Sequence, residues 1–167
     1  MIQIRDEKLS DVQAITEVTI AAFKDHPISH QTEHFIVAAL RAAGALTLSL
    51  VAEVDGKVVG HAAFSPVTIA DGSQGWYGVG PVSVVPALQR KGIGSALMRE
   101  GLFRLKVSGA KGCMLVGDPA YYVRFGFKNR PELVHEGIPQ QFFQVLGFGQ
   151  DTPRGVVKFH KAFEATS

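Results

Sequence analysis

Residues 82–97 read VSVVPALQRKGIGSAL. The apolar residues from Val79 to Val85 predict a largely buried strand, and Pro86 is expected to stop it. From about Gly92 to Val107 apolar side chains recur at helical spacing, which predicts an amphipathic helix. The chain is therefore expected to leave a buried strand, make a short turn and enter a helix whose first residues include Gly92 and Gly94.

The start of this helix is a candidate phosphate site. The first amides of a helix have no internal partner, and the peptide dipoles add partial positive charge there. Gly92 and Gly94 let an anion approach these amides without a Cβ in the way, and Arg90 and Lys91 can add charge-assisted contacts. Two glycines can also do no more than shape a tight turn, so the basic residues before them are what favours an anion site.

Two other phosphate motifs do not fit. The nucleoside-triphosphate loop needs glycine, four residues and then Gly-Lys-Ser/Thr, which the chain lacks. A dinucleotide fingerprint would need a third glycine where Leu97 stands.

The rest of the chain predicts the element order β-α-α-β-β-β-α-β-α-β-β. Ser10 and Gln13 form a candidate capping box for the first helix, and residues 68–75 are expected to be a loop. The strand–helix–strand unit over residues 79–116 implies a parallel pair of strands with a right-handed crossover. The other elements are expected at these ranges: strands at 2–5, 112–116, 142–148 and 156–159, helices at about 32–43 and from Asp118-Pro119, and a hairpin of 46–53 and 57–64 around Asp55-Gly56.

Size and composition fit one compact domain spanning residues 1–167. Apolar residues make up 46% of the chain and charged residues 19%, which allows a sizeable core. The net charge of +2 and the lack of basic clusters argue against a nucleic-acid partner. No apolar run approaches the ~20 residues that a membrane span needs, and the charged first residues do not suit a signal peptide. We therefore expect a cytoplasmic protein without nucleic-acid or membrane partners.

Two motifs in sequence order carry a family resemblance. Gln89-Arg-Lys-Gly-Ile-Gly94 matches Gln/Arg-x-x-Gly-x-Gly/Ala, the central signature of the GNAT superfamily of N-acetyltransferases. Tyr122-Val-Arg-Phe-Gly-Phe127 resembles the family's Tyr-x-x-x-Gly-Phe element. The run from Gly117 to Phe127 looks closest to the YhbS-like bacterial subgroup, and the firm resemblance covers about residues 80–127.

The resemblance implies a GNAT-like α/β fold and acetyl-coenzyme A (acetyl-CoA) as cofactor. The fold would be a mixed central sheet of about seven strands with helices on both faces, its parallel fourth and fifth strands splayed around the cofactor. The pantetheine arm would pair with backbone groups around Val82 to Val84, and Gln89 would order the loop. The implied cofactor-binding residues are Val82, Val84, Gln89, Arg90, Lys91, Gly92, Ile93, Gly94 and Ser95.

The implied reaction is direct attack of a primary amine on the thioester. Tyr122 is the candidate proton donor to the departing thiolate, and the backbone amide of Val84 is the candidate donor to the oxyanion. Most tyrosines only pack, so the motif is what favours Tyr122, while Tyr121 should point about 100° away on a helix. Glu53 and His61 on the hairpin, or a chain of waters, are alternatives for the general base.

Several readings stay open at the level of sequence. A domain that binds acyl-CoA without catalysis, as a sensor or scaffold, is the main alternative, and a nucleotide-binding regulatory domain is another. The acceptor is a small-molecule or peptide amine of undetermined identity, and a homodimer is open because family members are often dimers. His26, His30 and His34 are spaced four apart, but Pro27 breaks the helix, so we expect no metal site. Phe142, Phe143 and Phe148 are expected mainly in the core.

Overall fold

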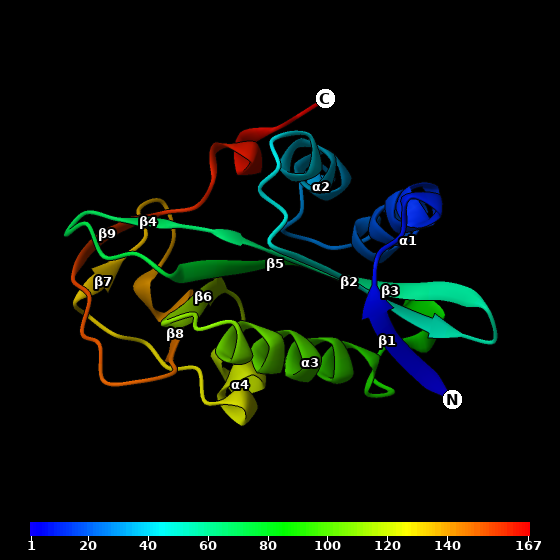
Figure 1. Ribbon diagram of the computed structural model, residues 1–167. Helices are drawn as coiled ribbons and strands as arrows, with labels where there is room; N and C mark the ends of the chain where they lie inside the picture. Colours follow the sequence, from blue (N-terminus) through cyan, green and yellow to red (C-terminus); the bar gives the residue numbers. More distant parts are fainter. The chain divides into compact units, whose positions relative to one another are not determined.

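The computed structural model describes residues 1–167 and contains two β-sheets and four α-helices, which are labelled in Figure 1. The strands are β1 (Ile2–Asp6), β2 (Leu48–Val54), β3 (Lys57–Pro66), β4 (Thr68–Ile69), β5 (Trp76–Val84), β6 (Gly112–Val116), β7 (Leu133–Val134), β8 (Phe143–Gly147) and β9 (Gly155–Lys158). The α-helices are α1 (Val12–Phe23), α2 (Glu33–Ala42), α3 (Ile93–Val107) and α4 (Pro119–Tyr122). The six-stranded sheet has the order β1-β2-β3-β5-β6-β8, and the three-stranded sheet has the order β4-β9-β7.

The chain divides into two compact units. The first contains residues 1–64, 80–102 and 161–167, and the second contains residues 65–79 and 103–160. The prediction of a single domain over residues 1–167 stays a prediction. No helix combines the length and the apolar character that crossing a membrane requires.

The first unit is built on the antiparallel strands β1, β2 and β3. The predicted hairpin of β2 and β3 is confirmed, and Asp55 and Gly56 both have positive φ (50° and 79°), as its tight turn requires. Helices α1 and α2 pack on the face of β2 that carries Val51, since Ile15, Val37 and Val51 form one buried cluster. This cluster removes apolar side chains of both helices from water, which is the main force holding them on the sheet.

The start of α3 packs on the other face of β3. A Cβ added at Gly60 would lie 3.1 Å from Leu97 and 3.2 Å from Ile93, so the bare glycine lets this helix approach the strand closely. Its neighbour His61 has its side chain on the opposite face, with Val51 directly across from it on β2. Figure 1 shows α1 and α2 on one side of these strands and α3 on the other.

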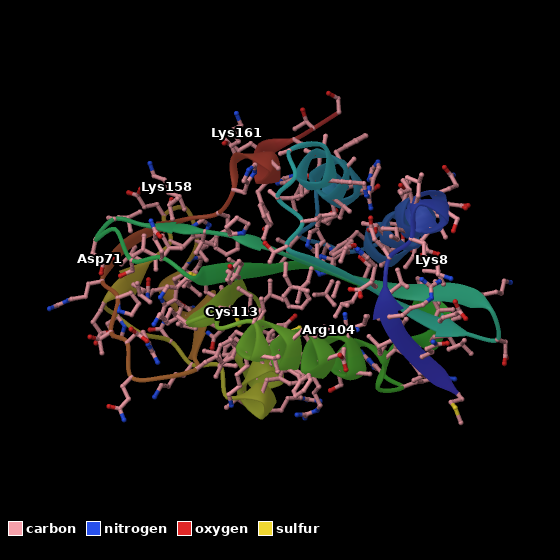
Figure 2. The ribbon with its side chains drawn as sticks, in the orientation of Figure 1. Lys8, Asp71, Arg104, Cys113, Lys158 and Lys161 are labelled. Atoms are coloured by element: carbon pink, nitrogen blue, oxygen red, sulfur yellow. The ribbon has the colours of Figure 1, made fainter.

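The second unit is built on β6 and β8, which pair antiparallel from Gly112↔Gly147 to Val116↔Phe143. Its core gathers apolar side chains of both sheets: Val67, Ile69, Trp76, Met114, Leu133, Phe143, Val145 and Val157. Cys113 lies in β6 (Figure 2), is fully buried, and has a thiol pKa that burial raises. The predicted parallel pair is confirmed as β5 and β6, whose register runs only from Trp76↔Gly112 to Gly78↔Met114. Because β5 continues to Val84, this short register agrees with the predicted splay.

The large sheet has six strands, close to the expected number of about seven, and three further strands form the second sheet. Two expectations need correction. Residues 68–75 are not wholly a loop, because they contain the two-residue strand β4, which is too short to show an alternating pattern. The capping box is not formed by Ser10 and Gln13; the Asp11 carboxylate accepts from the Lys8 amide at 2.7 Å, and Ser10 lies inside the 3-10 turn Leu9–Asp11.

Gly112→Ala is expected to destabilise the protein by about 2–3 kcal/mol, because its Cβ would overlap the Leu146 carbonyl oxygen and the Trp76 ring. The backbone carbonyl cannot move without breaking the β6–β8 ladder. The control is Gly149→Ala, whose Cβ would meet only Asp151 at 3.5 Å. Urea unfolding of the two variants should show a large change for the first and a change within about 0.5 kcal/mol for the second. Equal stabilities would contradict this packing.

Candidate functional site

The loop before α3 presents backbone amides beside two exposed cations. After β5, residues 86–88 form a 3-10 turn, and then Arg90 and Gly92 adopt positive φ of 63° and 87°. The Ala96 N–H donates to the Gly92 carbonyl at 3.0 Å and closes the first turn of the helix. The amides of residues 93–95 therefore precede the intrahelical hydrogen bonds and are available to an anion. A Cβ added at Gly92 would meet no heavy atom within 4 Å, so the approach to them is open.

Gln89 ties this loop to the end of β5. Its side-chain amide Nε2 donates to the Val84 carbonyl at 3.0 Å. The contact fixes the turn between the strand and the basic residues Arg90 and Lys91, both exposed. It is the kind of contact that an ordering role for Gln89 requires.

The edge of β5 next to this loop carries backbone groups that β3 does not use. The Val85 N–H donates to the Val59 carbonyl of β3 at 2.9 Å. Because successive residues of a strand direct their polar groups to alternate sides, the groups of Val82 and Val84 point away from β3. The Val84 carbonyl is engaged by Gln89, which leaves the Val82 groups and the Val84 N–H. An extended ligand can pair with such an edge as an added strand.

Tyr122 lies in the second unit, on a short helix whose start is capped. The Asp118 side chain accepts from the Ala120 amide at 2.9 Å, and Pro119 occupies the first helical position, as predicted. The Tyr122 ring packs over Gly117, where an added Cβ would lie 2.5 Å from Cε2, and its centroid is 6.0 Å from that of Phe127. Burial, with Tyr121 and Asp118 adding to it, raises the pKa of Tyr122 to about 12. The phenol is therefore protonated at neutral pH.

Tyr121 has different surroundings. Its ring meets the Tyr122 ring edge-on, with centroids 4.9 Å apart and an interplanar angle of 87°. The Arg124 guanidinium lies 4.2 Å above the Tyr121 ring, and its Nε donates to the Tyr121 carbonyl at 2.8 Å. Tyr121 is thus engaged in a cation–π contact, and the two rings differ in direction, as helical geometry predicts.

The two general-base candidates, Glu53 and His61, differ in their hydrogen-bond partners and in how deeply they are buried. The Glu53 carboxylate accepts from Arg5 Nε at 3.1 Å and from Arg5 Nη2 at 2.8 Å. His61 is fully buried, and its Nε2 lies 2.7 Å from Ser49 Oγ. Burial lowers the His61 pKa to about 4, with Arg41 acting in the same direction and Glu7 against it.

Sequence reasoning missed the groups behind His61. Ser49 donates to Glu7, whose carboxylate also accepts from Arg41 at 3.0 and 2.9 Å. Burial alone would raise the Glu7 pKa, but the hydrogen bonds from Arg41 and Ser49 outweigh it and lower that pKa. The hairpin register was the available signal, because Ser49 stands two residues from Val51 and so shares a face with His61.

The three phenylalanines that were expected mainly in the core differ in how deeply they are buried. Phe143 is fully buried in the core of the second unit, as expected, whereas Phe142 is 40% exposed. Phe148 is half-buried.

Comparison with known proteins gives consistent matches. Residues 45–129 match the model of the acetyltransferase (GNAT) domain. The chain is 36% identical to the N-acetyltransferase YhbS of Escherichia coli K12 over 134 residues, 74% of this chain and 78% of YhbS. A GNAT family acetyltransferase from Brucella melitensis, solved in complex with acetyl-CoA, has a TM-score of 0.88 and 53% identity, covering 98% of each chain. E. coli YhbS solved with CoA has a TM-score of 0.85 and 32% identity, covering 99% of this chain and 93% of YhbS.

Proposed function

Because the chain belongs to the GNAT family of N-acetyltransferases, we propose that it transfers the acetyl group of acetyl-CoA to a primary amine by direct attack on the thioester. The expected family, its YhbS-like subgroup and its mixed α/β fold are confirmed by the matches above. The observation that carries the proposal is the set of open amides at the start of α3, preceded by Arg90 and Lys91. Acetyl-CoA bound to the Brucella relative, and CoA bound to YhbS, support the choice of ligand.

The residues present fit this cofactor. Its diphosphate is a doubly charged anion that suits the amides of residues 90–95 and the neighbouring cations. Its pantetheine arm contains amides that suit the Val82 and Val84 edge of β5. Gln89 links the two parts through the Val84 carbonyl, so the loop and the strand edge hold one extended ligand together.

The chemistry needs a neutral amine and two groups from the chain. The amine must be neutral when its nitrogen bonds to the carbonyl carbon, and the Val84 N–H is our candidate for stabilising the oxyanion that develops. Tyr122 gives its proton to the sulfur as the carbon–sulfur bond breaks. A thiol has a pKa near ~8.5, well below the value of about 12 for Tyr122, so transfer to a free thiolate is unfavourable. We therefore propose that the Tyr122 hydroxyl hydrogen-bonds to the departing sulfur and passes its proton in concert with carbon–sulfur cleavage, which drives the transfer, and that the phenolate then regains a proton from solvent.

Calorimetry with acetyl-CoA tests the cofactor site. Arg90→Gln and Lys91→Gln should each weaken binding about tenfold, because each removes a charge-assisted contact to the diphosphate. The loss should shrink as salt is added. Lys57→Gln, which removes a charge from the tip of the β2–β3 hairpin, is the control and should bind like the wild type.

A panel of primary amines then tests the reaction, with release of the CoA thiol as the measurement and mass spectrometry to identify the product. Acetylated product is the expected result. Binding of acetyl-CoA without any acetylated amine would favour the sensor, and tighter binding of ATP or NAD would favour a nucleotide-binding domain. No binding of acetyl-CoA at all would refute the proposed function.

A further inference from the structure

A chain of hydrogen bonds in the first unit fixes the state of His61. The Glu7 carboxylate is held by Arg41 and accepts the one hydroxyl hydrogen of Ser49. Ser49 Oγ, 2.7 Å from His61 Nε2, must then accept from that nitrogen. The proton of the neutral ring is therefore on Nε2, and Nδ1 carries the lone pair. General-base histidines are commonly held in this way: a hydrogen bond at one ring nitrogen fixes the orientation of the ring, and the other nitrogen carries the lone pair that accepts a proton.

His61 Nδ1 and the Ser83 hydroxyl share a buried position without partners. Neither atom has a hydrogen bond within the protein, although both residues are at most 1% exposed. The hydrogen bond from Val85 to Val59 sets the register of β5 on β3 and places Ser83 directly opposite His61. Side chains at opposite positions of antiparallel strands lie on one face with Cβ atoms about 5 Å apart. The two polar atoms are therefore neighbours that are both closed to solvent, and a molecule that entered between them could bond to both.

This position is next to the cofactor strand. Ser83 stands between Val82 and Val84, whose backbone groups form the free edge of β5. Its side chain shares the face of His61, which carries α1 and α2, whereas the cations and amides of the diphosphate site belong to the start of α3 on the other face. A nucleophile that meets the acyl group from the α1 and α2 side would approach on the face that carries this buried pair of polar atoms.

On the basis of the proposed function, we propose that His61 Nδ1 is the proton acceptor for the amine, directly or through one water held by Ser83 Oγ, and that Ser49 and Glu7 position the ring. The amine nitrogen bonds to the carbonyl carbon, and the carbon–sulfur bond breaks. One N–H proton passes to Nδ1, while the sulfur receives its proton from Tyr122. Exchange with solvent then returns the proton of His61 to the Tyr122 phenolate, so the enzyme is unchanged after each turnover.

The charges around the ring suit a transient acceptor. Glu7 and Arg41 are the charged groups that act on it, Glu7 favouring the protonated ring and Arg41 opposing it. Since burial keeps the pKa near 4, the lone pair is available throughout the neutral range. A proton taken from the positively charged nitrogen formed by attack is therefore held only briefly.

The kinetic test compares His61→Gln, Ser49→Ala and Ser83→Ala with the wild type on the amine panel. His61→Gln should lower kcat about 100- to 1,000-fold, and the serine variants by smaller factors, with the Kd for acetyl-CoA within about twofold. Ser65→Ala is the matched control. Ser65 lies on β3 and, like Ser83, has a buried hydroxyl without a hydrogen-bond partner, but it is not opposite His61. It should retain the wild-type kcat.

Two further readouts separate this role from a structural one. Imidazole should partly restore turnover to His61→Ala, and other bases should do so in the order of their pKa values. In ¹⁵N spectra of histidine-labelled protein, Nδ1 of His61 should be unprotonated from pH 6 to 8 and should shift when acetyl-CoA saturates the protein. If His61→Gln turns over like the wild type, or if Nδ1 is protonated, the proposed role of His61 is wrong but the proposed function stands. Absence of turnover in the wild type overturns the proposed function as well.

Discussion

Tyr122→Phe is expected to lower kcat about 100- to 1,000-fold while the Kd for acetyl-CoA stays within about twofold. The ring packs over Gly117 and against Phe127, and phenylalanine keeps both contacts. The substitution removes only the hydroxyl, and with it the proton that we propose the sulfur receives. General acid catalysis contributes factors of about 10²–10⁴, which sets the size of the loss. Thiol release in steady state gives kcat, and calorimetry gives the Kd.

Tyr121→Phe is the matched control, since it removes the same group from the adjacent ring. The Tyr121 ring is held by the Arg124 guanidinium, a contact that phenylalanine also makes, so kcat should be close to that of the wild type. Because the Tyr122 pKa is near 12, ionisation of this group should not reduce wild-type activity up to about pH 10. Equal losses in the two variants, or none in either, would remove Tyr122 from the mechanism.

The parts of the fold that sequence predicts are those whose pattern repeats locally. Residues 93–107 show helical periodicity, residues 57–64 follow a turn pair that needs positive φ, and both elements occur as expected. β7 has only two residues, Leu133 and Val134, so there is no period to detect. The predicted capping box before α1 is wrong for a different reason: the Asp11 carboxylate accepts from the Lys8 amide of the preceding 3-10 turn and also pairs with Arg5, contacts that the spacing of Ser10 and Gln13 does not reveal.

In the candidate site, too, sequence predicts the residues that form a local pattern and misses those that depend on long-range contacts. Gln89 to Ser95 is one continuous segment, so its motif could be read directly. His61 is only one of two candidate side chains in the sequence, because its proposed role depends on Glu7, Ser49 and Ser83, which lie on different parts of the chain. Their meeting follows from the register of four strands, β1, β2, β3 and β5, and register depends on packing across the whole sheet. The pKa values near 4 for His61 and near 12 for Tyr122 are consequences of burial, which sequence does not give.

Ser95→Asp should separate the stability of α3 from its affinity for the cofactor. Ser95 is in the first turn of the helix, where a carboxylate interacts favourably with the dipole by about 0.3–1 kcal/mol. The same negative charge would stand close to the bound diphosphate. At a separation of about 5 Å and an effective dielectric constant near 20, repulsion per charge pair is roughly 3 kcal/mol before salt screening. Affinity for acetyl-CoA should therefore fall about 30- to 100-fold while the unfolding temperature holds or rises.

Ser95→Asn is the control for this prediction, because asparagine has nearly the shape of aspartate but no charge. Calorimetry should place its affinity for acetyl-CoA within about threefold of the wild type. Since a misfolded helix would lower stability and binding together, opposite changes in the aspartate variant can only come from the added charge. Its effect should also weaken at high salt, as repulsion between exposed charges does. If the aspartate and asparagine variants bind equally well, the diphosphate does not lie at the start of α3, and the amides of residues 90–95 serve only to shape the turn.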